Sequence, residues 1–338
     1  MSKLVTIGIP VYKRLDYLPN VLRVIAAQDY PNIDLLVSDN GMNGSAVPAI
    51  VDRCYPKPYR FRQNPSTVSC SSHFNQLIDN ASGEYFIALA DDDEISPNYV
   101  SELVRLLEKH PGASLALALE EQIDVTGELI RRSKDSVPEI LSGPDFIRAT
   151  WGTSQYGFQS LCTFLAETRR LTACGGFPEI WAATGDEDLL VVKLCLDNFI
   201  AFSPRCTFRK RFEETSFGYA IELQDLARGT REFIECLNSN PTLLDYARSH
   251  PSEWSELRSC LITNKWRCYY FRWATMYIKR LTTMKWALAA FYMPFIPTYY
   301  KAVAHTLFRT LVSSLVRTGR EHIPWADNLY RRFRPKPS

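Results

Sequence analysis

Strand patterns and helix patterns alternate along the first third of the chain, and this alternation constrains the fold more than any other feature. The run from Leu4 to Tyr12 has the apolar character of a buried strand, and apolar residues then recur at helical spacing from Leu18 to Ile25. A second strand pattern ends in the turn signal Asp39-Asn40-Gly41. Such alternation predicts parallel strands joined by crossover helices, and therefore a Rossmann-like α/β sheet.

A third buried-strand pattern lies in the stretch GEYFIALADDDEISPNYV, residues 83–100. Its apolar part, Tyr85 to Leu89, is followed at once by the three carboxylates Asp91 to Asp93. In open parallel sheets, ligands bind beyond the carboxyl ends of the strands. Tyr12, Asp39 and the three carboxylates each follow a strand end, so we expect them to meet in one crevice.

Three adjacent carboxylates in a dry crevice repel one another, so they must be protonated or recruit a cation. Mg²⁺ or Mn²⁺ would resolve the conflict, because both prefer oxygen ligands and Mg²⁺ accepts substrate phosphates beside one or two carboxylates. The residues alone therefore predict a metal-assisted nucleotide or phosphate site. The alternative is a solvated acidic turn at the start of the next helix.

Two segments, Val5 to Gly41 and Ala81 to Val100, together resemble the nucleotide-binding half of the inverting family 2 glycosyltransferases, which have the GT-A fold. The resemblance is close from Leu4 to Leu107 and looser up to about Ser216. Many family members have a further acid where this chain has Ala90. The resemblance implies an α/β GT-A fold and a divalent cation as cofactor.

The resemblance also assigns roles to individual residues. It implies that the base of a nucleotide-sugar is held by the segment around Pro10 and Tyr12 and by Asp39, with Asn75 near the nucleotide. It further implies that Asp91 and Asp92 lie beside the ribose and diphosphate, and that Asp93 ligates the metal. These assignments are expectations for the structure.

A general base is the remaining requirement, because an inverting transfer displaces the nucleoside diphosphate in one step and the acceptor hydroxyl is a poor nucleophile. The family usually supplies an aspartate after a Gly-Gly-Phe stretch. Here Gly175-Gly176-Phe177 precedes Asp186, Glu187 and Asp188. Asp186 is the predicted base and Asp188 the second choice. The alternative is that these acids only supply favourable charge at the start of the helix from Leu189 to Leu196.

Two further stretches have a functional and a structural interpretation. The basic stretch from Arg205 to Arg211 would, by the resemblance, close over the departing diphosphate, or would simply be an exposed basic segment. The aromatic segment from Trp151 to Ser160 would stack on an acceptor sugar, or would pack in the core.

Charge is distributed unevenly along the chain. The formal net charge is +2, but from Lys265 onward fourteen Lys and Arg residues stand against two acidic residues, with aromatic residues interleaved. The longest uncharged run, Trp286 to Tyr300, contains two prolines and is shorter than the about twenty residues of a spanning helix. We expect amphipathic helices on an anionic membrane surface. A helical domain with inward aromatics and a nucleic-acid surface are the alternatives, and no motif supports a nucleic-acid partner.

Cysteine usage and the N-terminus bear on the cellular compartment. The nine cysteines are odd in number and none shows C-x-x-C spacing, which favours reduced thiols over disulfides or structural zinc. The first residues enter a strand pattern directly, without the features of a secretory signal. The expectation is a cytoplasmic protein, peripheral at the inner face of the cytoplasmic membrane.

We therefore expect a GT-A domain over residues 1–225, with a nucleotide-sugar half at about 1–110 and an acceptor half at about 111–225, and a helical module over 226–338. The expected reaction transfers a sugar from a nucleotide-diphosphate sugar to a hydroxyl of a lipid-linked glycan in bacterial surface-polysaccharide biosynthesis, of the O-antigen or capsule type. One alternative is a sugar nucleotidyltransferase, although its usual glycine-rich phosphate loop is absent from PVYKRLD. The other is a catalytically silent scaffold in a polysaccharide-assembly complex.

Overall fold

A computed structural model describes residues 2–158, 163–213 and 221–280 of the chain. The chain divides into two compact units, 1–262 and 263–338, and the predicted domain boundary at residue 225 stays a prediction. Residues 281–338, which hold most of the sequence behind the predicted membrane association, lie outside the described residues. The fold below is that of the first unit.

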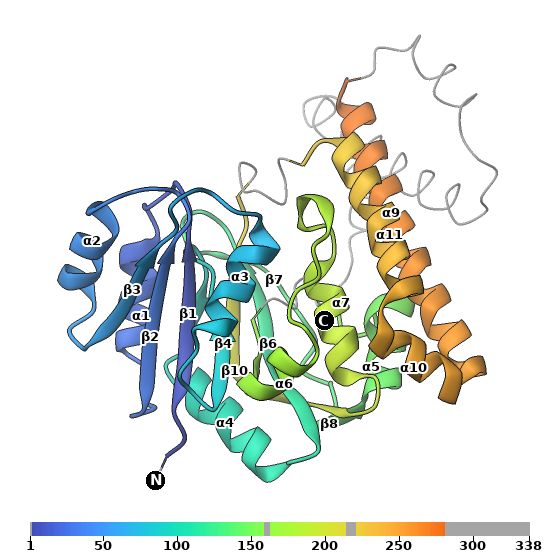
Figure 1. Cartoon of the computed structure of the whole chain (residues 1–338), viewed down its shortest axis with the longest axis horizontal. Coiled ribbons are helices and arrows are strands. Elements are labelled where there is room, and N and C mark those ends of the chain that lie inside the picture. The colour runs from blue at the N-terminus through green and yellow to red at the C-terminus, as the bar shows by residue number, and fades with distance from the viewer. Residues whose placement is uncertain (1, 159–162, 214–220, 281–338) are drawn as a thin grey trace, which may run out of the picture. The chain divides into compact units, whose positions relative to one another are not determined.

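A ten-stranded sheet forms the centre of this unit, and Figure 1 shows its strands side by side. Its strands follow the order β3 (Tyr59–Gln63), β2 (Ile33–Asp39), β1 (Val5–Val11), β4 (Tyr85–Ala88), β9 (Leu165–Glu167), β6 (Ala113–Ile123), β10 (Phe199–Arg211) and β5 (Glu94–Ile95). Two more strands pair at the side, β7 (Leu129–Arg132) with β6 and β8 (Ile140–Ser142) with β10. The pairs β3-β2, β2-β1, β1-β4 and β6-β10 are parallel, while β9 runs antiparallel to both of its neighbours.

Helices cover both faces of the sheet, as the alternation of strand and helix patterns predicts. The helices of the described residues are α1 (Leu18–Ala26), α2 (Ala46–Cys54), α3 (Cys70–Asp79), α4 (Tyr99–Lys109), α5 (Gly143–Ile147), α6 (Thr168–Ala173), α7 (Asp186–Cys195), α9 (Leu223–Ser239), α10 (Pro241–Ser249) and α11 (Pro251–Arg280), with a π-helix η1 (Arg148–Gly152) and a 3₁₀-helix η2 (Trp181–Ala183). In Figure 1, α3, α6 and α7 lie in front of the sheet and α1 behind it. The α/β fold class, with a mostly parallel sheet flanked by helices, is confirmed.

Two hydrophobic cores result, one on each face of the sheet. Successive side chains of a strand point to opposite faces, and β4 shows the consequence: Ile87 packs in the core with α1, α2 and α4, whereas Phe86 packs in the core with α3, α7 and α9. Gly8 on β1 lets α3 approach closely, since a Cβ there would lie 3.0 Å from the Phe86 ring and 3.3 Å from Leu77 Cβ. Close packing of α3 on β1 places the start of this helix beside the strand ends.

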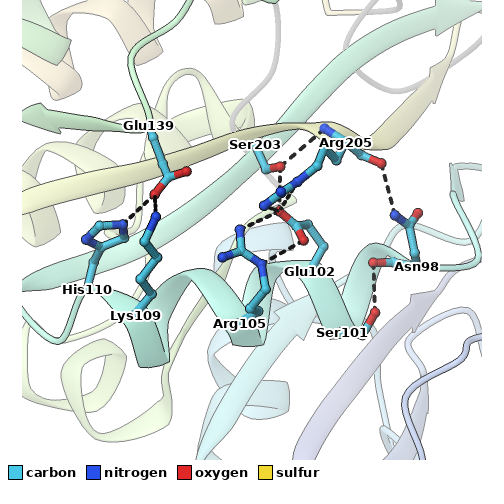
Figure 2. A network of polar contacts seen from close by, with 9 residues as sticks. All are labelled: Asn98, Ser101, Glu102, Arg105, Lys109, His110, Glu139, Ser203 and Arg205. Atoms are coloured by element: carbon cyan, nitrogen blue, oxygen red, sulfur yellow. Dashed lines mark hydrogen bonds and ion pairs between the residues drawn. The ribbon is translucent and has the colours of Figure 1, made fainter.

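A buried carboxylate holds α4 on β10 where the register of β10 shifts, between Ser203 and Thr207. Figure 2 shows Glu102 of α4 accepting hydrogen bonds from Ser203 Oγ at 2.6 Å and from the guanidinium groups of Arg105 and Arg205. Asn98 Nδ2 also donates to the Arg205 carbonyl at 2.9 Å. These contacts satisfy polar groups that the irregular strand leaves without ladder partners.

Two further observations concern the cysteines and membrane-spanning segments. The cysteines that the structure describes are free thiols. No helix within the described part of the chain combines the length and the apolar character of a membrane-spanning segment.

Candidate active site

The carboxyl ends of β1, β2 and β4 meet at one edge of the sheet and bring together residues that the sequence places far apart. Val11 and Asp39 are register partners on β1 and β2, so Tyr12 follows directly beside Asp39. On the other side of β1, Gly8 pairs with Ala88 of β4, three residues before Asp91. The structure thus places Pro10, Tyr12, Asp39 and the carboxylates 91–93 at the same edge, as predicted.

Asp39 is fully buried and organises the loop that follows β2. Its Oδ1 accepts a hydrogen bond from the Gly41 amide at 2.8 Å, and its Oδ2 accepts one from the Asn43 amide at 2.7 Å. The Asn43 side chain in turn donates to the Tyr12 carbonyl. Gly41 packs so closely on Tyr12 that a Cβ would overlap with this carbonyl. The loop is therefore preorganised beside the exposed Tyr12 ring.

The three carboxylates after β4 lie in different environments. Asp93 is buried, and its Oδ1 accepts a hydrogen bond from the Arg211 amide at 2.9 Å. Burial and the charge of Asp92 raise the pKa of Asp93 well above its ordinary value. Burial, with the same neighbouring charge, raises the pKa of Asp91 to about 7. Burial also raises the pKa of Asp92, against the opposing charge of Arg14.

Two arginines that lie far apart in the sequence contact this cluster of carboxylates. Arg14, in the loop after β1, pairs through Nη2 with Asp92 Oδ2 at 2.5 Å and also contacts Glu213. Arg211, at the end of β10, is buried and donates to Glu94 Oε1 at 2.6 Å and to the Asp92 carbonyl at 3.0 Å. Sequence reasoning did not single out Arg14, because a lone arginine in a loop carries no pattern.

The predicted basic stretch does not act as one unit. Arg205 is held by Glu102, and Arg209 pairs with Glu94 at 2.7 Å and with Glu121 at 3.3 Å. Only Arg211 among these three arginines donates to the backbone of the acid cluster. Arg205 and Arg209 therefore have structural partners within the sheet, and their predicted role at the diphosphate stays a prediction.

Carboxylate oxygens of residues 91–93 are of the chemical type that Mg²⁺ or Mn²⁺ prefers. Repulsion within the cluster and burial raise the pKa values of Asp91 and Asp93, and a cation would relieve both effects. The residues thus fit a divalent cation in chemistry. Over the described residues, however, no three His, Cys, Asp or Glu side chains already form a cluster that could hold a metal ion.

The second group of acids opens α7. Asp186 is the first residue of the helix and is buried, whereas Glu187 and Asp188 are partly exposed. Asp186 Oδ2 accepts a hydrogen bond from Ser71 Oγ at 2.7 Å, and its Oδ1 accepts one from the Glu187 amide at 2.9 Å. The two hydrogen bonds hold the carboxylate in one orientation at the helix N-terminus. Asp186 is thus fixed at both of its carboxylate oxygens.

Helix α3 contacts both Asp186 and β2, the strand that ends at Asp39. Ser71 near its start contacts Asp186, and His73 Nε2 lies 2.9 Å from Ser38 Oγ on β2. Burial lowers the pKa of His73 to about 4, so this imidazole is neutral at pH 7. Asn75 donates to the Phe177 carbonyl and accepts from the Phe177 amide, both at 2.8 Å. Asn75 therefore clamps the Gly-Gly-Phe loop, a role that sequence reasoning missed; its predicted nucleotide contact stays a prediction.

Lys193 also holds the Gly-Gly-Phe loop. Its buried Nζ donates to the Cys174 carbonyl at 2.9 Å and to the Gly176 carbonyl at 2.6 Å, and burial lowers its pKa.

In the aromatic segment, Trp151 is buried and packs edge-on against Phe146, with ring centroids 5.9 Å apart. Core packing, the structural interpretation of this segment, holds for Trp151.

Comparison with known proteins gives relatives of one kind. Residues 6–169 match the family model described as glycosyl transferase family 2. An uncharacterized glycosyltransferase of Rickettsia conorii is 29% identical over 188 residues, which cover 55% of this chain and 30% of the relative. Another uncharacterized glycosyltransferase, from Rickettsia typhi, is 32% identical over 108 residues, which cover 32% of this chain and 33% of the relative. The chain thus spans about a third of the length of these curated relatives.

Solved structures with the same fold are also found. The crystal structure of Staphylococcus aureus TarS 1–349 in complex with UDP-GlcNAc has a TM-score of 0.57 at 15% identity, covering 82% of this chain and 87% of that one. A mannosyltransferase from Pyrobaculum calidifontis in complex with GDP-Man and Mn²⁺ has a TM-score of 0.50 at 13% identity, covering 90% and 84%. Residues 6–169 are therefore similar to glycosyl transferase family 2, and the chain has the GT-A fold of these solved structures.

Proposed function

We propose that the chain is an inverting glycosyltransferase that moves a sugar from a nucleotide-diphosphate sugar to a hydroxyl group. The observation that carries this proposal is the presence of two acid sites, one at the sheet edge and one at the start of α7. Carboxylates 91–93 stand at the sheet edge, and the buried Asp186 is fixed by Ser71 at 2.7 Å. The carboxylates at the sheet edge suit the diphosphate of a donor, and Asp186 suits the proton of an acceptor hydroxyl.

The donor would bind at the sheet edge. The Asp39 loop, Pro10 and the exposed Tyr12 are the proposed contacts of the base, and Asp91 and Asp92 those of the ribose and diphosphate. Asp93 would hold a divalent cation that supplies positive charge at the diphosphate. The complexes of the solved structures with UDP-GlcNAc and with GDP-Man and Mn²⁺ support this assignment.

The chemical step requires a carboxylate that accepts a proton. Asp186 would take the proton of the acceptor hydroxyl as its oxygen bonds to the anomeric carbon from the face opposite the leaving group. The bond between that carbon and the diphosphate oxygen breaks in the same step, which inverts the configuration. Arg14 and Arg211 lie at the acid cluster and would stabilise the charge of the leaving diphosphate.

The cellular context of the proposal rests on composition. A basic, aromatic-rich C-terminal region suits an anionic membrane surface and a lipid-linked glycan acceptor on its cytoplasmic side. We therefore place the reaction in surface-polysaccharide biosynthesis of the O-antigen or capsule type. Vesicle co-sedimentation of the full chain with neutral and with anionic vesicles tests the membrane part independently of catalysis.

The reaction itself is tested with purified full-length protein in two steps. Thermal shift against UDP, dTDP, GDP and CMP, with and without Mn²⁺, identifies the base, because a ligand that binds only the native state raises its apparent stability. Hydrolysis of the matching nucleotide-sugar, with water as acceptor, is then compared between Asp186→Asn and its matched control Asp188→Asn.

We expect Asp186→Asn to lower donor hydrolysis by about 10²-fold or more, the usual contribution of a general base, with the nucleotide-induced thermal shift unchanged. Asp188→Asn should retain most of the activity, because the side chain of Asp188 is partly exposed. The proposal fails if no nucleotide shifts the folded wild-type protein, a result that would favour the scaffold alternative. Equal activity of Asp186→Asn and the wild type would remove Asp186 as the base.

A further inference from the structure

An exposed tryptophan precedes the predicted base. Trp181 opens the 3₁₀-helix η2, five positions before Asp186, and is 43% exposed. Indole rings are usually buried over most of their surface, so an exposed one beside a reactive group requires an explanation. Periodicity does not reveal this tryptophan, because a single tryptophan between Ile180 and two alanines has no periodic pattern.

Helix α9 fixes the orientation of this ring. Trp181 Nε1 donates to Asp225 Oδ1 at 2.8 Å, and the Trp181 amide donates to Glu232 Oε2 at 2.6 Å. The Arg228 guanidinium lies over the ring, 3.6 Å from its centroid. Gly229 permits this approach, since a Cβ there would lie 2.5 Å from the Trp181 carbonyl. The indole is thus held through its polar edge and one face before any ligand arrives.

The backbone that joins Trp181 to the base is strained. Ala182 and Ala183 have φ values of 54° and 50°, and Gly185 has a φ of 90°. The left-handed conformation costs an alanine about 1 kcal/mol, and such strain persists only where surrounding contacts enforce it. Here the contacts to α9 on one side and the start of α7 on the other enforce a fixed spacing between the indole and Asp186.

We propose that Trp181 is the stacking platform for the acceptor, and that it receives the apolar face of the acceptor sugar. This inference rests on the proposed function, because it assumes that the group facing Asp186 is the acceptor. Arg228 covers one face of the indole, so the sugar stacks on the other. The carboxylate of Asp225 at the ring edge offers an acceptor for sugar hydroxyls, which selects a glycan over a lipid chain.

The acceptor, not the donor, is the ligand that this position suits. The predicted donor contacts come from the loops after β1, β2 and β4, whereas Trp181 belongs to the segment that carries Asp186. Sugar rings expose C–H groups on one face, and these pack on an aromatic ring while the hydroxyls stay hydrated or bonded. A ring already satisfied at its N–H loses little freedom on binding, which favours affinity.

Saturation-transfer NMR with methyl glycosides of glucose, galactose, mannose, rhamnose and N-acetylglucosamine tests the platform without knowledge of the natural acceptor. The full-length protein is examined as wild type, Trp181→Ala, Trp181→Phe and Phe199→Ala. Phe199 is the matched control, because it is 49% exposed and stands at the start of β10, the opposite end of the parallel strands. Thermal shift with the nucleotide that binds the wild type reports whether each variant keeps its donor half folded.

We expect at least one glycoside to bind the wild type and Phe199→Ala with equal affinity. The same glycoside should bind Trp181→Ala about tenfold more weakly and Trp181→Phe with intermediate affinity. No glycoside binding to the wild type, or unchanged binding to Trp181→Ala, would overturn the platform. A loss in Phe199→Ala as large as in Trp181→Ala would also overturn it. Absence of a nucleotide shift together with Trp181-dependent glycoside binding would instead refute the proposed function and leave the platform standing.

Discussion

Replacing Glu102 with glutamine measures how much one buried carboxylate contributes to holding α4 on β10. The Glu102 side chain is 10% exposed and accepts hydrogen bonds from Arg105, Ser203 and Arg205 (Figure 2). The hydrogen bond from Arg105, followed by those from Ser203 and Arg205, lowers the pKa of Glu102 from 4.5 to about 2. Glutamine keeps the size of the side chain and removes its charge.

The expected loss follows from this pKa. A change from 4.5 to about 2 corresponds to about 3 kcal/mol at 1.36 kcal/mol per pH unit. We reduce this to about 2 kcal/mol of unfolding free energy at pH 7, because the Arg105 and Arg205 side chains are 40% and 59% exposed and their charges are screened by water. The folded carboxylate stays charged to lower pH than the unfolded one, so the contribution is complete above about pH 5 and is lost as the pH falls towards 2.

Guanidinium denaturation of the wild type and Glu102→Gln at pH 7, 5 and 3 is the assay. The difference in unfolding free energy should be the same at pH 7 and 5 and fall to about half or less at pH 3. Glu139→Gln is the control, because the pKa of Glu139 is also lowered to about 2, by Lys109 first, but its side chain is 41% exposed. An exposed pair contributes about 1 kcal/mol or less. Equal losses in the two variants, or a Glu102 difference that persists at pH 3, would refute the reasoning.

Three other predictions concern the loops and helix around the proposed site. Burial lowers the pKa of His73 to about 4, so between pH 6.5 and that value the unfolded state takes up a proton that the folded state does not. In guanidinium denaturation, the wild type should therefore lose about 2 kcal/mol of unfolding free energy between pH 7 and 5 that His73→Gln keeps. Gly176→Ala should lower the melting temperature clearly more than Gly175→Ala, because both have positive φ but only a Cβ at 176 would overlap with Asn75; equal shifts would contradict the clamp. In Asp93→Ala, the Mn²⁺-dependent part of the nucleotide-induced thermal shift should disappear, and its survival would exclude Asp93 as a metal ligand.

Periodicity was sufficient to predict the elements whose burial pattern is local. The helix expected from Leu18 starts at Leu18, and the strand expected before Asp39 ends there, because an apolar period specifies which face of an element is buried. The central antiparallel strand β9 has only three residues and no period. Its place is set by pairing with β4 and β6, which no local signal in the sequence encodes.

Chain order likewise predicted which acids would share an edge of the sheet, but not what would hold them. Asp91 to Asp93 follow a strand, and parallel topology alone brings them to Asp39. Their cationic partner Arg14 also contacts Glu213, 199 residues away, and Asp186 is held by Ser71 across 115 residues. Contacts at such separations depend on the packing of whole helices, so spacing within the sequence cannot reveal them.

The position of α3 limits how this protein can be re-engineered. One face of this short helix holds Asp186 through Ser71 and the Gly-Gly-Phe loop through Asn75, while His73 contacts Ser38 of β2. A chimera made to exchange donor preference would normally join one parent's first hundred residues to another's remainder. Such a junction would separate α3 from the loop at 175–186 that it supports. Grafts should therefore carry both segments from the same parent.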